Sequence, residues 1–203
     1  KSMEWIRRVE KYIDLTFAEL LPRLDHIAGE RVIAEPVTTC LDSLVWHPEL
    51  TIPNEYIIPK SNNVLVYHSV GNYDSRTADL GKNIKGTPAI LSAIERLKSE
   101  GFKVQLIFIK NNTPNREIRY LQAQADIIID QLNYGRYGAT AREGMMLGKP
   151  VVSCTNKEEF LPHLKSNVLD ECPVVSSSEL EVYNTLKKLI QEPELRLRIG
   201  KES

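Results

Sequence analysis

The sequence predicts an α/β fold in which a parallel sheet is flanked by helices, and three features of residues 62–203 predict it. Short apolar runs recur along this stretch, and longer segments with helical periodicity separate them. Threonine or proline marks helix starts, and glycine marks helix ends. Strands that alternate with helices in this way form βαβ units, whose strands lie parallel.

The first sixty residues have a different texture. Residues 3–11 predict the end of a helix, and short strands are expected at Tyr12–Phe17 and Arg31–Val37. Several prolines between Cys40 and Lys60 indicate either a linker or a segment wrapped over the surface.

From Asn62 onward the predicted elements follow in regular order. Val64–Tyr67 predicts a buried strand, a polar loop spans Gly71–Lys85, and Thr87-Pro88 begins a helix that Gly101 ends. Further along, the sequence predicts four strands, Val104–Ile109, Asp126–Ile129, Val151–Cys154 and Pro173–Val175. The helices expected between them run from Thr113-Pro114 to about Gln124, along a short segment ended by Gly148, and over Lys157–Leu164. After the last strand, a Ser178/Glu181 capping box precedes a helix carrying Leu180, Tyr183, Leu186 and Ile190, and a last helical turn follows Pro193.

Composition excludes several classes of function. A net charge of −1 gives no basic face for duplex DNA or another polyanion, so no nucleic-acid partner is expected. No apolar run approaches the roughly 20 residues of a membrane helix. The cysteines are Cys40, Cys154 and Cys172, an odd and widely spaced set that favours free thiols in a reducing compartment, and hence the cytoplasm. The histidines lack metal-ligand spacing, and no metal site is expected.

The stretch Asp130–Val151 carries the strongest functional signal. An apolar strand leads into a loop containing Gly135 and Gly138, and the loop enters a short helix. Free backbone N–H groups and the positive end of the helix dipole make such a junction an anion site.

The polar loop after the first strand of this region offers a second candidate. Gly71, Arg76, Lys82 and Lys85 combine flexible backbone with cations, which suits a diphosphate, and Lys85 stands directly before a helix start. The alternative is an ordinary solvated loop. The sequence contains neither G-x-G-x-x-G nor a P-loop at this place, so those nucleotide-binding modes do not apply.

Two titratable residues have two interpretations each. Glu143 either forms a capping box with Thr140 or accepts hydrogen bonds from paired hydroxyls, such as those of a ribose. His68, at the end of a strand, is either a base or phosphate contact or a buried histidine with satisfied nitrogens.

Three blocks of residues resemble the donor-binding half of GT-B-type glycosyltransferases, in particular the group 1 class of retaining enzymes. They are K-G-T at Lys85–Thr87, A-D-I-I-I-D at Ala125–Asp130, and the Y-G…E-G-M-x-L-G-K-P-V-V segment from Tyr137 to Val152, and the resemblance covers about Asn62–Ser203. It implies the C-terminal, Rossmann-like half of a GT-B fold. Residues 61–203 are then the nucleotide-sugar donor-binding domain. Residues 1–60 are then the tail of an N-terminal acceptor domain, together with the interdomain linker.

The resemblance also implies roles for individual residues. Glu143 matches the glutamate that contacts the nucleotide ribose, and the amides around Gly138, Ala139 and Thr140 match those that contact the diphosphate. Lys85 matches the lysine that neutralises the leaving diphosphate. Two positions depart from the family pattern: Gly135 stands where the first glutamate of E-x7-E is expected, and Leu80 stands where an arginine is expected. Arg76 or Lys82 is then the substitute for that arginine.

The function implied is metal-independent, retaining transfer of a sugar, of the hexosyl type, from a nucleoside diphosphate sugar to a hydroxyl, without a further cofactor. The acceptor is expected to be a glycan or a lipid-linked molecule, as in polysaccharide biosynthesis, bound mainly by a domain outside this chain. The fragment alone is therefore expected to be weakly active or inactive, and peripheral membrane association of the full-length protein is left open. Two alternatives remain: an epimerase-like sugar-nucleotide enzyme, and a non-catalytic Rossmann-like assembly domain.

Overall fold

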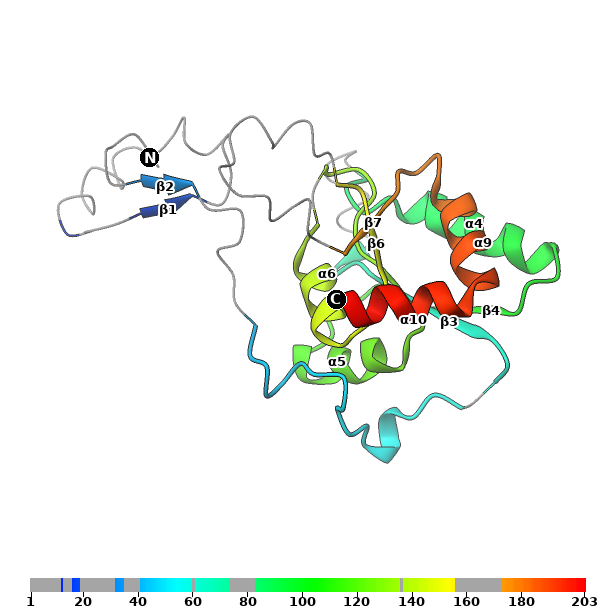
Figure 1. Ribbon diagram of the computed structural model, residues 1–203, viewed down its shortest axis with the longest axis horizontal. Coiled ribbons are helices and arrows are strands. Elements are labelled where there is room, and N and C mark those ends of the chain that lie inside the picture. Colours follow the sequence, from blue (N-terminus) through cyan, green and yellow to red (C-terminus); the bar gives the residue numbers. More distant parts are fainter. Residues whose placement is uncertain are drawn as a thin grey trace. The chain divides into compact units, whose positions relative to one another are not determined.

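The computed structural model describes residues 12, 16–18, 32–34, 41–59, 61–73, 83–135, 137–155 and 173–203 (Figure 1). The chain divides into two compact units, one of Lys1–Cys40 with Asn156–Glu171 and one of Leu41–Thr155 with Cys172–Ser203. In the first unit β1 (Thr16–Ala18) pairs in parallel with β2 (Val32–Ala34). These strands overlap the two strands predicted there, whereas the helices predicted at 3–11 and Lys157–Leu164 lie outside the described residues.

The second unit is built around one parallel sheet. Its strands are β3 (Val64–Ser69), β4 (Val104–Ile109), β5 (Ile127–Ile129), β6 (Val151–Ser153) and β7 (Val175–Ser176). They lie in the order β4-β3-β5-β6-β7, and every neighbouring pair is parallel. The predicted α/β class with a parallel sheet is therefore confirmed.

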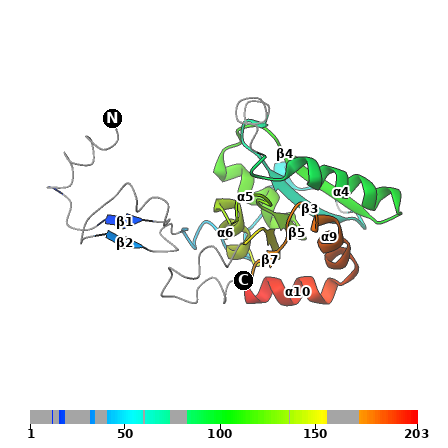
Figure 2. The ribbon, with the colours of Figure 1, turned by 90° about the horizontal axis from the view of Figure 1, so that it is seen from above.

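Helices cover both faces of this sheet (Figures 1 and 2). They are α4 (Thr87–Ser99), α5 (Asn115–Gln124), α6 (Ala139–Met146), α9 (Val182–Gln191) and α10 (Pro193–Glu202). The buried residues of α4 and α9 pack on one face with Ile127 and Ile129, while those of α6 pack on the other face with Ile128. Successive residues of a strand point to opposite faces, so a sheet covered on both sides needs an unbroken apolar run such as Ile127–Ile129.

The predicted boundaries needed local correction. Gly86, in a left-handed conformation at φ 70°, is the N-cap of α4, and Thr87 is its first helical residue rather than its cap. Leu180 is 93% exposed and precedes α9, so it does not belong to the buried face of that helix. The last turn predicted after Pro193 is the ten-residue helix α10.

The proline-rich segment between Cys40 and Lys60 lies on the second unit over much of its described length. Gln124 in α5 accepts a hydrogen bond from the Ile58 N–H at 2.8 Å and donates to the Tyr56 carbonyl at 2.8 Å. The rings of Tyr56 and Tyr120 stack at 5.0 Å. Of the two predicted alternatives, the wrapped surface segment therefore describes the short helix η2 (Asn54–Tyr56) and its surroundings.

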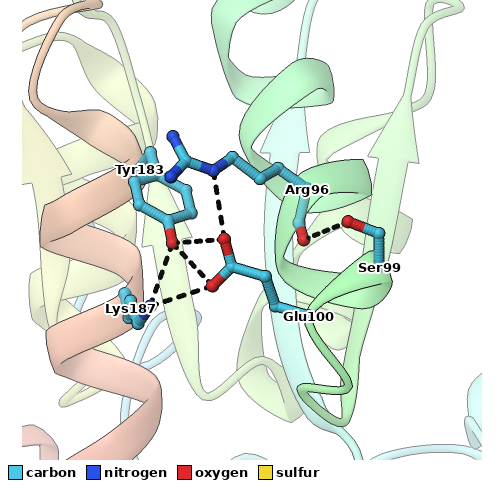
Figure 3. A network of polar contacts seen from close by, with 5 residues as sticks. All are labelled: Arg96, Ser99, Glu100, Tyr183 and Lys187. Carbon is cyan, nitrogen blue, oxygen red and sulfur yellow. Dashed lines mark hydrogen bonds and ion pairs between the residues drawn. The ribbon is translucent and has the colours of Figure 1, made fainter.

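Helices α4 and α9 are joined by an ion cluster at the C-terminal end of α4 (Figure 3). The Glu100 carboxylate accepts from the Tyr183 hydroxyl at 2.7 Å and from the Lys187 ammonium at 2.9 Å, and Arg96 reaches it from one turn earlier. These donors, Lys187 first, lower the pKa of Glu100 to about 2. The cluster therefore keeps its charge well into acid.

Gly200 in α10 provides a test of how closely this helix packs against the end of α6. A Cβ at Gly200 would overlap the carbonyl oxygen of Gly148, which is backbone and cannot rotate away. Alanine normally favours a helix over glycine by about 1 kcal/mol. Here Gly200→Ala is expected to lower the free energy of unfolding by about 2 kcal/mol, because overpacking outweighs propensity. Urea denaturation measures the change, and the neighbouring exposed Lys201→Ala is the control; equal stability of the two variants would contradict the packing.

Candidate functional site

The strand order gives the sheet a switch point at its carboxyl edge. The chain passes from β3 to β4 on one side and then returns to β5 on the other side of β3. The segments that leave β3 and β5 therefore diverge, and ligands of open parallel sheets bind where this happens. Both loops singled out in the sequence begin at this switch point.

The described parts of the two loops are held together. The Asn133 backbone N–H donates to the Ile84 carbonyl at 3.1 Å, and its side-chain amide donates to the Asn83 carbonyl at 2.6 Å. A Cβ at Gly86 would lie only 2.7 Å from Cβ of Leu132, so the start of α4 approaches the loop after β5 as closely as backbone allows. Residues far apart in sequence thus form one rigid edge.

Asp130 lies at the centre of this edge, directly after β5. Its carboxylate is fully buried and accepts from the Lys85 ammonium through Oδ1, at 2.5 Å, and from the Gly138 backbone N–H through Oδ2. The Lys85 side chain is 18% exposed, so its ammonium remains within reach of solvent. Two of the predicted phosphate contacts, Lys85 and Gly138, therefore meet on one internal anion.

Helix α6 begins beside this pair. Gly138 is its N-cap, and Ala139 and Thr140 are its first two residues. Their N–H groups have no acceptor within the helix and stand at the positive end of its dipole. With Gly138 engaged by Asp130, these amides are the ones that the helix geometry leaves for a ligand.

The capping box proposed for Glu143 does not form. Within the described residues the N-cap of α6 makes no side-chain hydrogen bond, and Glu143 lies more than a turn into the helix. Its side chain is only 8% exposed, and its Oε2 accepts from the Gln122 amide at 2.8 Å. Burial raises the pKa of Glu143, while the Gln122 hydrogen bond lowers it. The Glu143 carboxylate therefore binds α5 instead of capping α6.

His68 is the buried, satisfied histidine of the two interpretations. Its Nδ1 lies 3.1 Å from the Ile129 carbonyl oxygen, so Nδ1 must donate and Nε2 must accept from the Thr87 hydroxyl at 2.9 Å. Burial lowers the pKa of His68 to about 4, which keeps the ring neutral. The residue joins β3 to the start of α4 and is not poised as a base.

The remaining candidates fall in different places. Gly71 lies in the turn after β3, where a Cβ would approach Oδ1 of Asn112 to 3.0 Å, while Arg76 and Lys82 lie outside the described residues. Gly135 adopts φ 78°, a conformation that a glutamate rarely takes. A glutamate, which the resemblance places at this position, would therefore be strained there.

Sequence reasoning gave no role to Asp130 or Gln122. A signal existed for Asp130, because a single carboxylate directly after a buried apolar strand stands at the ligand edge of a parallel sheet. No comparable signal existed for Gln122, which lies in an ordinary amphipathic helix. Its contact with Glu143 depends on how α5 and α6 pack together.

No group of three or more His, Cys, Asp or Glu side chains in the described part of the chain could hold a metal ion. None of the helices described is long and apolar enough to cross a membrane.

Comparisons with known proteins show the fold. No family model and no curated protein matches the sequence. The C-terminal domain of a group 1 family glycosyl transferase from Francisella tularensis is similar in structure, with a TM-score of 0.50 and 16% identity over 80% of this chain and 94% of that chain. Sucrose-phosphate synthase from Thermosynechococcus elongatus is similar with a TM-score of 0.57 and 15% identity, over 98% of this chain. The match spans 55% of that synthase. The predicted Rossmann-like fold of a GT-B C-terminal half is thereby confirmed.

Proposed function

We propose that this chain binds the donor for a glycosyltransferase, which moves a hexosyl group from a nucleoside diphosphate sugar to a hydroxyl. The observation that carries the proposal is that Lys85 and Gly138, the N-cap of α6, both bind Asp130 at the switch point of the sheet, with Glu143 further along the same helix. Two solved structures with this fold are named as a glycosyl transferase and a sucrose-phosphate synthase, which supports the same class.

Each part of the site suits one part of a nucleoside diphosphate. The N–H groups of Ala139 and Thr140, with the α6 dipole, suit the diphosphate. Glu143 lies further along the same helix, and its carboxylate is the hydroxyl acceptor that we propose for the ribose beside the diphosphate. The site therefore has acceptors for hydroxyls beside donors for phosphates.

The proposed chemistry places the leaving diphosphate on Lys85 and the α6 N-terminus. As the bond between the anomeric carbon and the diphosphate oxygen breaks, negative charge grows on that oxygen, and these positive groups stabilise it. The acceptor oxygen forms the new bond to the anomeric carbon, and its proton passes to the departing diphosphate oxygen. Retention of configuration, independence of a metal ion, and an acceptor site in an N-terminal domain are parts of this proposal.

Titration calorimetry with UDP, GDP, ADP and CDP tests the proposal. At least one is expected to bind to the wild-type chain, with an affinity that falls as salt rises, because the contact is partly ionic. Absence of binding to all four by a chain with intact circular dichroism would overturn it and favour an assembly domain. An epimerisation assay on a longer protein would separate the epimerase alternative.

A second lysine at the same edge of the sheet serves as a control that separates a specific phosphate contact of Lys85 from nonspecific attraction by positive charge. Lys110 is exposed and follows β4 at the same edge of the sheet. Lys110→Gln is expected to leave the affinity within about twofold, since exposed charges are screened by salt. The charge-neutral pair Lys85→Gln with Asp130→Asn is expected to lower it by at least about tenfold, the worth of one charged hydrogen bond.

A further inference from the structure

A small polar cluster is buried between the sheet and the α5/α6 layer. Tyr67 from β3 and Gln122 from α5 are fully buried, and Glu143 from α6 is nearly so. Tyr67 belongs to an apolar cluster with Ala125, Ile128, Ala141 and Val151. Polar groups in such surroundings cost free energy unless they are hydrogen-bonded, so their arrangement calls for a reason.

The hydrogen bonding of Gln122 is one-sided. Its Nε2 donates to Oε2 of Glu143 at 2.8 Å, whereas its own Oε1 makes no hydrogen bond within the described part of the chain. The Tyr67 hydroxyl makes no hydrogen bond of normal geometry there either. Burial raises the pKa of Tyr67 to about 12, and the nearby side chains of Ser69 and then Gln122 act against this effect. The amide thus leaves its oxygen unpaired while its N–H stays on the carboxylate.

This arrangement has two effects on Glu143. It fixes one carboxylate oxygen against α5, so the other oxygen, Oε1, keeps a defined direction. It also supplies a donor that favours the ionised carboxylate, against the burial that disfavours it. Once ionised, a carboxylate with one oxygen fixed in this way can offer its other oxygen to a pair of sugar hydroxyls.

We propose that Gln122 is a positioning residue that holds Glu143 for recognition of ribose hydroxyls, and so gives the site its preference for ribonucleotides over 2′-deoxyribonucleotides. This proposal rests on the proposed donor-binding function. Gln122 acts only through Glu143, because its own polar atoms are buried. Removal of the amide should therefore affect contacts to the ribose and leave contacts to the phosphates unchanged.

The experiment compares three kinds of probe on two variants. The probes are the four ribonucleoside diphosphates, their 2′-deoxy counterparts and inorganic pyrophosphate. Gln122→Met removes the amide and keeps the length of the side chain. The matched control is Gln124→Met in the same helix, because the Gln124 amide bonds the backbone of Tyr56, Ile58 and Tyr120 and not Glu143.

The wild type is expected to prefer ribose by about tenfold, the worth of one hydrogen bond to a charged group. Gln122→Met should abolish this preference by weakening ribonucleotide binding alone, and Gln124→Met should retain it. An equal loss for ribonucleotides, 2′-deoxyribonucleotides and pyrophosphate would reduce Gln122 to a structural role and overturn the proposal. A preference that survives Gln122→Met would overturn it as well. Failure of the proposed function is distinct, since the wild type would then bind no probe.

A second variant keeps the test open if Gln122→Met does not fold. Gln122→Glu has nearly the shape of the wild type but places a second carboxyl beside Glu143. Two adjacent carboxyls share one proton in acid and repel each other when both ionise. The ribose preference should therefore appear only in acid for this variant. The other charged groups acting on Glu143, namely Asp130, Lys85 and Arg142, are unchanged. A preference independent of pH would contradict the proposed positioning.

Discussion

Lys85→Met is expected to lower the free energy of unfolding of the second unit by about 3 kcal/mol, because it leaves a buried carboxylate without its cation. Asp130 is fully buried, and Lys85 is its ion partner. The N–H of Gly138 remains as a donor, but a neutral amide stabilises a carboxylate less than an ammonium does. Urea denaturation followed by circular dichroism measures the loss.

The second half of this prediction is a rescue. Asp130→Asn in the Lys85→Met chain removes the uncompensated charge, and the double variant is expected to recover most of the lost stability. The coupling free energy from the four-variant cycle should be about 2 kcal/mol, as for residues in direct contact. Lys110→Met, which removes an exposed lysine at the same edge, should change stability by less than about 0.5 kcal/mol. Additive effects of the two single changes would show that the pair does not interact in solution.

Glu143→Gln is expected to raise the melting temperature at neutral pH while it weakens ribonucleotide binding by about tenfold or more. Burial raises the pKa of Glu143 in the folded state, so the unfolded chain loses this proton first as pH rises. Stability therefore falls with rising pH from about 4.3, the ordinary glutamate value, to the raised value. A glutamine amide has no proton to lose and can still accept from Gln122.

Melting curves measured at acid and neutral pH check whether Glu143→Gln raises or lowers stability. The advantage of Glu143→Gln should be full at neutral pH and should vanish in acid below about pH 4, where the wild-type carboxyl is also neutral. Glu95→Gln, which removes a carboxylate that is 73% exposed, is the control and should show no such pH dependence. If Glu143→Gln were less stable than the wild type at neutral pH, the ionised carboxylate would stabilise the fold. The prediction that Glu143 lowers stability while it serves binding would then be wrong.

Local patterns in the sequence were sufficient for most elements of the second unit. The strand Val104–Ile109 has the predicted bounds, because glycine ends the preceding helix and an apolar run follows at once. Helix α5 begins at Asn115, within two residues of its prediction, since the Thr-Pro pair sets its start. Leu180 was misplaced because an apolar residue beside a capping box resembles the first position of a buried helix face.

Some residues of the candidate site could also be identified from the sequence, and others could not. Lys85, Gly138 and Glu143 could be singled out because each stands at a strand-loop-helix junction, whose chemistry is local. Their partners could not be found, because Asp130 lies 45 residues from Lys85 and Gln122 lies 21 residues from Glu143. Which side chains meet over such separations depends on how the strands are ordered and how the helices pack.

The sequence by itself determined that this protein is a parallel α/β structure, and it predicted an anion-binding junction at Asp130–Thr140, because apolar periodicity and helix-start residues act over a few neighbouring positions. Only the tertiary structure decided what that junction contains. It gave the junction an internal anion, Asp130, that binds Lys85 and Gly138, and it placed Glu143 on Gln122 instead of in a capping box. The physical reason is that the hydrogen-bond partners of a buried carboxylate set its direction, and those partners meet only in the packed fold.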